Sequence, residues 1–275
     1  MASKKNINVM WFRQDLRLAD NPALLKALED GKTLPIFIFD NVNSKDHING
    51  SASKWWLHNS LTQLNKSLKN KLCFYKGNPL EILDEINKEY KIINIFWNRC
   101  YEPWRIRRDK KIKKYFTDKD VNVSTFNGSL LWEPWNIAKK DGTPYKVFTP
   151  YYRKGCLNSD KPRMPLPIPD LSNLTSIDGQ DIKIEDLDLM PKHNWYEKMT
   201  SLWSPGEEGA LSKIDEFILN GLDNYKEGRN FPSNKNVSQL SPHLHFGEVS
   251  PNQVWYRAKT KEGKLGIKKD LDHFL

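Results

Sequence analysis

The stretch INVMWFRQDLRLADNPALLKALEDG, residues 7–31, contains the structural unit that sets the fold of this chain. Its first six residues are apolar except for one asparagine, and a run of this length is typical of a buried strand. Asn21 followed by Pro22 is a typical helix start, and Gly31 marks the end of the apolar periodicity that follows. The stretch therefore predicts a strand over 7–12 that leads into a helix beginning at Pro22.

The same alternation of strand and helix continues up to residue 126. Four further runs are short and rich in β-branched or aromatic residues: LPIFIF (34–39), LCFY (72–75), IINIFW (92–97) and VNVSTF (121–126). Segments whose apolar residues recur with helical periodicity separate these runs, and Asn78 with Pro79 opens one of the helices. Repeated strand–helix–strand units predict the α/β class, with a doubly wound parallel sheet of five strands and helices on both faces.

The composition is that of a basic chain without a membrane segment. Its 275 residues include 43 Lys and Arg against 34 Asp and Glu, a formal net charge of +9 at pH 7. A basic chain can bind an anionic partner such as nucleic acid, although charge alone does not establish one. No apolar run approaches the ~20 residues of a membrane span, and the first residues lack the apolar stretch of a secretion signal. We therefore expect a cytoplasmic protein that binds no membrane.

Cysteine and histidine give no indication of a metal site. Cys73, Cys100 and Cys156 lie far apart and form no CxxC pair, so neither a disulfide framework nor a zinc site is indicated. His243 and His245 are two residues apart in a short predicted helix, with no cysteine or carboxylate to complete a ligand set. We expect three reduced thiols, packing or surface histidines, and no metal.

The regular pattern ends after residue 126. Residues 157–194 contain five prolines: Pro162, Pro165, Pro167, Pro169 and Pro191. This composition indicates a linker, and a linker of this length indicates a connection between two domains. We predict an α/β domain over 1–135, an interdomain linker over 136–200 and an incomplete all-helical domain over 201–275.

Only helices are predicted beyond the linker. In Ser204–Glu207 the serine is predicted as an N-cap, the proline as the first helical residue and the glutamate as the capping-box partner. A second helix opens at Ser241 and ends at Gly247, and Ser250–Gln253 is a capping box that opens a third. Because the chain stops at DLDHFL (270–275) within an unfinished apolar pattern, we expect it to be cut short.

Charged side chains follow the first strand. Arg13, Asp15, Arg17 and Asp20 are placed at its carboxyl end, which is where parallel sheets bind ligands. A ligand site and a self-satisfied Arg/Asp network that holds the loop both explain them, and their chemistry favours the network. No glycine-rich phosphate-binding fingerprint follows any predicted strand, so an ordinary NAD or ATP site is not indicated.

A second charged stretch is RCYEPWRIRRDKKIKK at 99–114, with eight basic residues against Glu102 and Asp109. A phosphate-binding stripe and a solvated helix face are both consistent with it. The solvated face is the favoured interpretation.

Six motifs resemble those of the photolyase/cryptochrome family and occur in the same order. They are WFRQDLRLADNPAL (11–24), WNRCYEP (97–103), TPYKVFTPYYRK (143–154), WSPGEEGA (203–210), YKEGRNFP (225–232) and LSPHLHFGEVSPNQVW (240–255). The similarity covers essentially the whole chain, and its LHFGEVSP form resembles bacterial class I cyclobutane-dimer photolyases. The resemblance implies an N-terminal α/β antenna domain, a linker, and the beginning of an all-helical domain that binds FAD.

The resemblance also implies a function. In the family, a deoxyribodipyrimidine photo-lyase uses light and electron transfer from reduced FAD to repair cyclobutane pyrimidine dimers in damaged DNA. We expect a monomer with an antenna pigment that is either methenyltetrahydrofolate or a deazaflavin, and no activity from a fragment alone. Two alternatives stay open: a cryptochrome-type blue-light photoreceptor, and a non-catalytic α/β antenna-like binding module.

Individual residues are assigned by the same resemblance. Seven match FAD-binding positions: Tyr225, Val237, Ser238, Gln239, Leu240, Ser241 and Phe274. Serine hydroxyls and free backbone N–H groups at the helix that starts at Ser241 would form an anion site. The family usually has Thr-Ser where this chain has Val237 and Ser238, so one hydroxyl contact is lost. Arg229 matches a DNA-facing arginine, and no catalytic residue is assigned within the chain.

Overall fold

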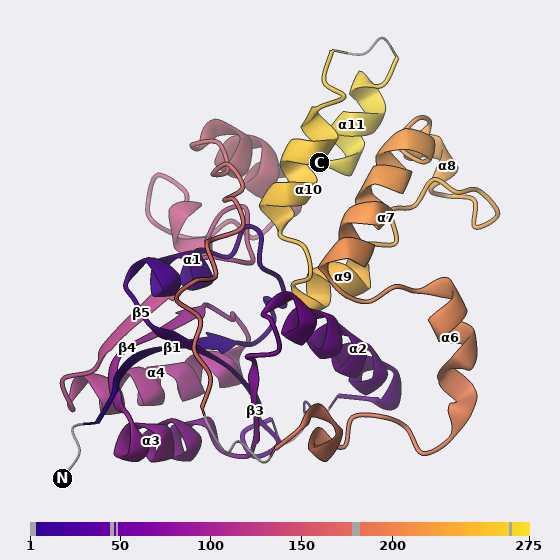
Figure 1. Cartoon of the computed structure of the whole chain (residues 1–275). Helices are drawn as coiled ribbons and strands as arrows, with labels where there is room; N and C mark the ends of the chain where they lie inside the picture. Colours follow the sequence, from indigo (N-terminus) through magenta and orange to yellow (C-terminus); the bar gives the residue numbers. More distant parts are fainter. Residues whose placement is uncertain (1–3, 45–46, 48, 178–181, 264–265) are drawn as a thin grey trace.

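Five parallel strands form a single sheet in the computed structural model, which describes residues 4–44, 47, 49–177, 182–263 and 266–275. The strands are β1 (Asn6–Phe12), β2 (Thr33–Phe39), β3 (Cys73–Lys76), β4 (Lys91–Asn98) and β5 (Asn122–Phe126), in the order β3-β2-β1-β4-β5 (Figure 1). In this doubly wound order the chain moves outward from β1 to one edge and then returns to its other side. The predicted strands and the α/β class are confirmed.

Helices cover both faces of the sheet. They are α1 (Pro22–Glu29), α2 (Ser51–Ser67), α3 (Pro79–Glu89) and α4 (Pro103–Thr117). Side chains alternate across β1, so Met10 and Phe12 pack with α1 and α2, whereas Val9 and Trp11 pack with α3 and α4. Each face therefore has its own apolar core, and residues 4–126 are called the sheet region below.

The predicted helix starts in the sheet region are confirmed. The side chain of Asn21 accepts a hydrogen bond from the backbone N–H of Leu24, and Asn78 accepts one from Leu80. Both caps satisfy backbone donors that the first helical turn leaves without a partner. Gly31, just past the end of α1, has a φ of +130°, a conformation that favours glycine.

Residues 127–203, called the connecting segment below, are mostly irregular. Their short elements are η1 (Pro134–Asn136), α5 (Phe148–Pro150), η2 (Tyr151–Gly155), η3 (Cys156–Asn158), η4 (Ile184–Leu187), η5 (Asn194–Tyr196) and α6 (Glu197–Leu202). The segment nevertheless packs closely, because Leu174, Leu187 and Leu189 are buried in the core beneath α1 and α2. It is irregular, as predicted, and it is fixed against the sheet region.

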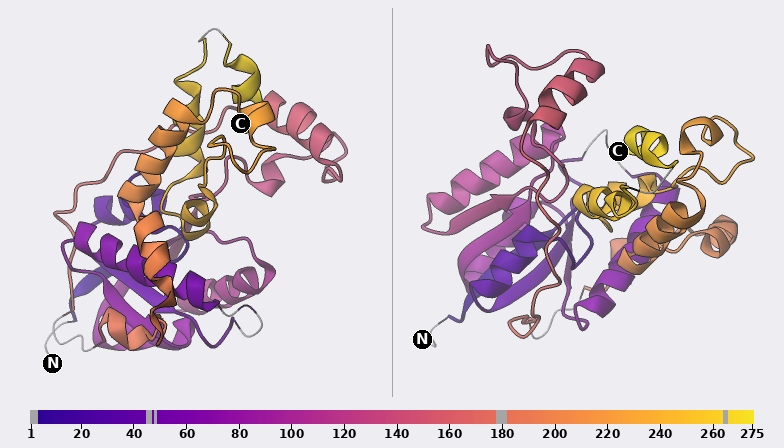
Figure 2. Two further views of the ribbon diagram at one scale, coloured as in Figure 1. Left: turned by 90° about the vertical axis from the view of Figure 1, so that its right-hand side faces the viewer. Right: turned by 90° about the horizontal axis from the view of Figure 1, so that it is seen from above.

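Residues 204–275, called the helical region below, contain only helices among the positions described. These are α7 (Glu207–Asn220), α8 (Tyr225–Gly228), α9 (Ser241–Phe246), α10 (Pro251–Lys259) and α11 (Lys268–Phe274). Figure 2 shows them gathered together at one side of the sheet region, and α7 contacts both α2 and α10. The Ser250 capping box at the start of α10 and the end of α9 at Gly247 are confirmed.

The predicted start of α7 is wrong. The N-cap is Gly206, with a φ of +109°, and Ser204 lies outside the helix. The carboxylate of Glu207 forms no capping box, because it accepts hydrogen bonds from the backbone N–H groups of Leu18 and Ala19 in the sheet region. A contact distant in sequence has replaced the local one.

The three cysteines are free and buried, as expected for reduced thiols. Burial raises the pKa of Cys73 to about 11, which keeps its thiol protonated at neutral pH. Within the described part of the chain, no helix has the length and apolar character required to cross a membrane.

Candidate functional site

Arg17 joins the sheet region to the helical region. Its side chain is almost completely buried, and its guanidinium donates hydrogen bonds to the carbonyl oxygens of Ala19 at 3.1 Å, Asp20 at 2.8 Å and Gly128 at 2.6 Å. A fourth hydrogen bond, of 2.9 Å, reaches the carbonyl oxygen of Gly247 at the end of α9. One side chain thus fixes the loop after β1, the loop after β5 and the helical region relative to one another.

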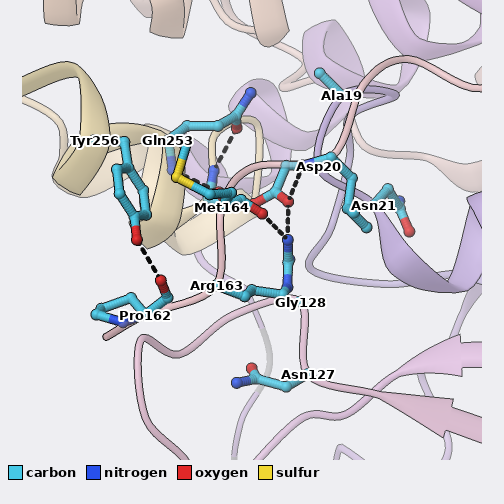
Figure 3. A network of polar contacts seen from close by, with 12 residues as sticks. Ala19, Asp20, Asn21, Asn127, Gly128, Pro162, Arg163, Met164, Gln253 and Tyr256 are labelled. Atoms are coloured by element: carbon cyan, nitrogen blue, oxygen red, sulfur yellow. Dashed lines mark hydrogen bonds and ion pairs between the residues drawn. The ribbon is translucent and has the colours of Figure 1, made fainter. Parts of the chain in front are cut away.

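Asp20 makes a second connection of the same kind. Its buried carboxylate pairs with Arg163 and accepts a hydrogen bond from the backbone N–H of Leu166, both in the connecting segment. It also accepts a hydrogen bond from the hydroxyl of Ser250, the N-cap of α10. Figure 3 shows Asp20 and Arg163 meeting beside Gln253 of α10. Asp20 therefore holds three segments together.

Arg13 and Asp15 complete this arrangement on the sheet side. Arg13 pairs with Asp109 of α4, and its guanidinium lies 5.1 Å from the ring centre of Trp11. Asp15 accepts hydrogen bonds of 2.6 Å from the backbone N–H of Arg13 and from the side-chain amide of Asn98. The charged groups after β1 are paired within the protein, which supports their interpretation as a network; among these four residues, Nε of Arg13 is the one buried side-chain polar atom left without a hydrogen bond.

Two carboxylates of the helical region, one buried and one partly buried, also contact the sheet region. Glu248 of the GEVSP motif accepts hydrogen bonds of 2.8 Å from the indole N–H of Trp56 and from the backbone N–H of Gly206, and it lies 2.5 Å from Nδ1 of His243. His243 is therefore a packing residue. Burial raises the pKa of Glu207, the second of these carboxylates. We call the contacts of Arg17, Asp20, Glu207 and Glu248 the junction.

A cavity of about 290 Å³, called the carboxyl-edge cavity, opens where β1, β2 and β3 end. Its walls include Trp104 and Arg108 of α4 and His245 of α9. His47 and Trp104 lie with their rings stacked at 6.1 Å between centres, and the Arg108 guanidinium lies 5.2 Å from the Trp104 ring. This position is the expected one for a ligand of a doubly wound sheet.

Several donors around the carboxyl-edge cavity lack a hydrogen-bond partner. Among the described residues, Trp11 Nε1 and Arg13 Nε are buried and make no hydrogen bond, whereas Arg105 Nε makes no hydrogen bond but lies 3.3 Å from the carboxylate of Glu102; all three of these donor residues line the cavity. Buried donors usually find an acceptor. The aromatic and cationic walls, together with these donors, suit a planar ligand that carries acceptor or anionic groups.

Three of the residues assigned by sequence resemblance lie together in the helical region. The rings of Tyr225 and Phe274 meet edge to face at 5.5 Å, and the Arg229 guanidinium lies 5.3 Å from the ring of Tyr225. Arg229 and Phe274 both line a cavity of about 800 Å³, which we call the helical cavity. Trp255 of α10 and Tyr152 of the connecting segment form other parts of its wall.

The other assigned residues, 237–241, do not line this cavity, and neither does Tyr225. Leu240 is buried in a small apolar cluster with Ile214 and Val249. Val237 and Ser241 are exposed, and Ser241 is the first residue of α9, whose N-terminus has no side-chain cap. The free N–H groups there retain the capacity to bind an anion.

The basic side chains of the stretch at 99–114 fall into two groups: some pair with a carboxylate, and others are exposed to solvent. Arg99 pairs with Glu133, and Arg108 pairs with Asp40 and Asp109. The remaining basic side chains of α4 are mostly exposed: Arg107, Lys110, Lys111, Lys113 and Lys114. This exposure agrees with a solvated helix face. No group of three or more potential metal ligands occurs among the described residues.

Comparisons of the sequence with known proteins identify one family. Residues 8–170 match the family model described as DNA photolyase. The deoxyribodipyrimidine photo-lyase of Agrobacterium fabrum is 39% identical over 256 residues, which is 91% of this chain and 53% of that protein. Cryptochrome-2 of Arabidopsis thaliana is 32% identical over 92% of this chain and 43% of its own length. The chain thus spans about half the length of these curated relatives.

A solved structure is similar to this chain over the chain's whole length. The crystal structure of a bacterial class III photolyase from Agrobacterium tumefaciens has a TM-score of 0.89 and 37% identity, and the match covers 100% of this chain and 57% of that one. This neighbour indicates a subtype different from the class I enzyme expected from the LHFGEVSP form. With the matched family model spanning more than half of its residues, the chain belongs to the DNA photolyase family.

Proposed function

We propose that this chain forms the antenna domain, linker and first part of the flavin domain of a light-driven DNA-repair enzyme, with boundaries at 1–135, 136–200 and 201–275. The proposed reaction is the cleavage of cyclobutane pyrimidine dimers in DNA. The observation that carries the proposal is the 39% identity to a deoxyribodipyrimidine photo-lyase across 91% of the chain, which includes both sides of the junction. A monomer in the cytoplasm stays a prediction.

The proposed FAD site has two parts. The uncapped N-terminus of α9, with the hydroxyls of Ser238 and Ser241, suits the phosphates, and the backbone of 237–240 lies next to it. Phe274 offers aromatic surface at the helical cavity, and the ring of Tyr225 packs edge to face against it. When bound in reduced form and excited by light, FAD supplies the electron that cleaves the dimer. These residues bind and orient the cofactor and exclude water from one side of it.

Arg229 is proposed to contact a DNA phosphate. Its side chain is exposed, lies over the Tyr225 ring and lines the helical cavity, so its charge is available beside the aromatic residues of the flavin site. In enzymes that act on bases in duplex DNA, the target nucleotides leave the stack and enter a pocket. A cation at the mouth of this cavity would hold the backbone of such a nucleotide.

The antenna pigment is proposed to occupy the carboxyl-edge cavity. Its donors without a hydrogen-bond partner at Trp11 and Arg13 and the ring of Trp104 fit a planar pigment with carbonyl or carboxylate groups. Methenyltetrahydrofolate and a deazaflavin both meet this description. Absorption spectra of the pigment released from purified protein distinguish the two.

The test uses the 275-residue chain and the same chain extended with the remaining C-terminal residues of the Agrobacterium fabrum photo-lyase. We expect the extended protein to retain FAD and to cleave dimers in an oligonucleotide under blue light, and the chain alone to do neither. In the extended protein, Ser241→Ala should lower FAD retention, because a hydrogen bond to a charged group contributes roughly 1.5–3 kcal/mol. An extended, folded protein that binds FAD without repair would contradict the repair function.

FAD binding without repair in the extended protein would favour the second candidate, a cryptochrome-type photoreceptor. The specific observation behind it is the 32% identity to cryptochrome-2 of Arabidopsis thaliana over 92% of this chain. An extended protein that binds no flavin would instead favour a non-catalytic binding module.

A further inference from the structure

A further cavity, open to solvent, lies at the opposite edge of the sheet from β3. It has a volume of about 330 Å³ and is bounded by the ends of β4 and β5, by α4 and by η1. The residues that line it include Trp97, Tyr101, Ile106, Lys110, Lys113 and Trp135. It shares no lining residue with the carboxyl-edge cavity, and we call it the Trp135 cavity.

Trp135 is an exposed aromatic ring in a fixed position. It is 61% exposed, yet the Arg99 guanidinium lies 5.6 Å from its ring centre and the Tyr101 ring lies 6.2 Å away. Glu133 fixes both neighbours, because it accepts hydrogen bonds from Arg99 at 2.7 and 2.9 Å and from the Tyr101 hydroxyl at 2.6 Å. A large ring that is both held and solvent-exposed provides a platform on which a planar group can stack.

The cations at this cavity differ in whether they are neutralised. Arg99 is paired with Glu133, and Asp109, the carboxylate in the wall, is paired with Arg13 and with Arg108. Lys110 and Lys113 are exposed, and the side chain of neither makes an ion pair or hydrogen bond within the described part of the chain. Since they are three residues apart on α4, their side chains share one helix face. Two positive charges therefore remain beside the aromatic wall.

Apolar aromatic walls with unneutralised cations at one side complement one chemical class of ligand. We propose that the Trp135 cavity binds a planar heteroaromatic molecule with an anionic phosphate or carboxylate group. The ring system stacks on Trp135 and Tyr101, and the anion lies between Lys110 and Lys113. This inference is independent of the proposed repair function, because it uses no residue of the flavin site or of the carboxyl-edge cavity.

The test compares FMN with riboflavin, which carries the same ring system without the phosphate. Each is titrated into the 275-residue chain, and stacking is followed by quenching of flavin fluorescence. We expect FMN to bind more tightly than riboflavin by roughly fivefold, because only FMN meets the two lysines. Trp135→Ala should weaken the binding of both by about tenfold, the size of one lost stacking contact.

Matched variants on the same helix separate the site from general charge attraction. Lys110→Gln with Lys113→Gln should abolish the preference for FMN, whereas Lys111→Gln with Lys114→Gln, which removes the same charge elsewhere on α4, should preserve it. Trp104→Ala, in the carboxyl-edge cavity, should leave the Trp135-dependent binding unchanged. Trp135 is exposed, so its removal does not open the core, and circular dichroism checks the fold of each variant.

Titrations with GMP and with folinate, followed by isothermal titration calorimetry because neither is a flavin, show which natural source of this chemistry fits best. Binding of any of the three anions that depends on Trp135, Lys110 and Lys113 supports the proposal. Two results would overturn it: no binding of any of the three, or binding that Trp135→Ala leaves unchanged. A loss as large in the Lys111 and Lys114 variant as in the Lys110 and Lys113 variant would also overturn it.

Discussion

The sheet region and the helical region bury their apolar side chains to different extents. Each face of the sheet has one continuous core, to which several strands and two helices contribute. In the helical region, Phe246 joins the core of the sheet region, and the other clustered buried apolar residues form two small groups, one around Ile214 and one around Phe217. Leu219 is 73% exposed there, and Phe231 is 59% exposed. The sheet region is therefore stabilised by its own core, whereas the helical region depends on its neighbour.

The connection between the two regions is largely polar. Arg17, Asp20, Glu207 and Glu248 are buried or nearly buried, and each reaches a group on the other side. Leaving a buried charged group without its hydrogen-bond partner is costly, because that group has lost its hydration without a replacement. The junction should therefore be the most sensitive part of the chain, and the following variants test this comparison.

The largest effect is expected from Gly247→Ala. A Cβ there would collide with the carbonyl oxygen of Gln14 and lie 2.6 Å from Cα of Asp15, and the φ of +67° disfavours any side chain. We expect a loss of about 4 kcal/mol or more in the free energy of unfolding, measured in urea. Gly142→Ala is the control, because its φ is +78° but nothing lies within 4 Å of the added Cβ. Equal losses in the two variants would show that backbone strain, and not the junction, is responsible.

Glu248→Gln should have the next largest effect. The variant retains one acceptor for Trp56 and Gly206 but removes the charge that faces His243. We expect a loss of about 2–3 kcal/mol in the free energy of unfolding. Glu216→Gln removes an exposed carboxylate of α7 that pairs with Lys213 at 3.1 Å, and it should cost less than about 1 kcal/mol. A similar loss in both variants would contradict the importance of burial at the junction.

A smaller difference in stability is expected between variants of two helix caps. Ser250 caps α10 and also donates a hydrogen bond to Asp20 across the junction, whereas Asn78 caps α3 within the sheet region only. Ser250→Ala should cost about 2 kcal/mol and Asn78→Ala about 1 kcal/mol, both measured by thermal or urea unfolding. The reverse order would mean that the hydroxyl contact with Asp20 contributes little.

The smallest expected effect concerns two carboxylates, Asp84 and Glu207, whose contributions to stability should change with pH in opposite directions. Hydrogen bonds from Lys119, Lys88 and Tyr115 hold the pKa of Asp84 well below its usual range, so its contribution is present above about pH 4 and is lost as the pH falls further. Burial raises the pKa of Glu207, so its contribution is present below about pH 4 and is lost as the pH rises toward neutral.

Unfolding temperatures measured from pH 3 to pH 7 for Asp84→Asn and Glu207→Gln, against the unsubstituted chain, check these signs. Asp84→Asn should flatten the loss of stability at acid pH. Glu207→Gln should remove a gain of stability on acidification from neutral pH. Identical pH profiles for the two variants would contradict the assignment.

Local signals in the sequence predicted most of the fold. Each strand is a short apolar run, and Asn21, Asn78 and Ser250 cap their helices through residues two or three positions away. Such contacts depend on spacing within one segment, which a sequence displays directly. For this reason the sheet, its helices and the start of α10 were all predictable.

The candidate sites were less predictable, because their residues meet only in the folded chain. Glu207 has the spacing of a capping box, yet its partners are Leu18 and Ala19, which lie about 190 positions earlier in the chain. The carboxyl-edge cavity combines three strands, α4 and α9, and no local pattern brings Trp104 and His245 together. Strand order places Arg13, Asp15, Arg17 and Asp20 at the carboxyl edge, so a network there was predictable. The ion-pair partners Asp109 and Arg163 are distant in sequence and were not predictable.

Hydrogen exchange followed by mass spectrometry tests most directly whether the helical region depends on the sheet region. Peptides from β1 and β4 should retain their amide hydrogens longest, while those from α7 and α10 should exchange earlier, as expected for a unit with a lower free energy of opening. Gly247→Ala should then accelerate exchange in α7 and α10 and leave β1 and β4 unchanged. Equal protection of both regions in the unsubstituted chain, with an equal loss in the variant, would contradict this account.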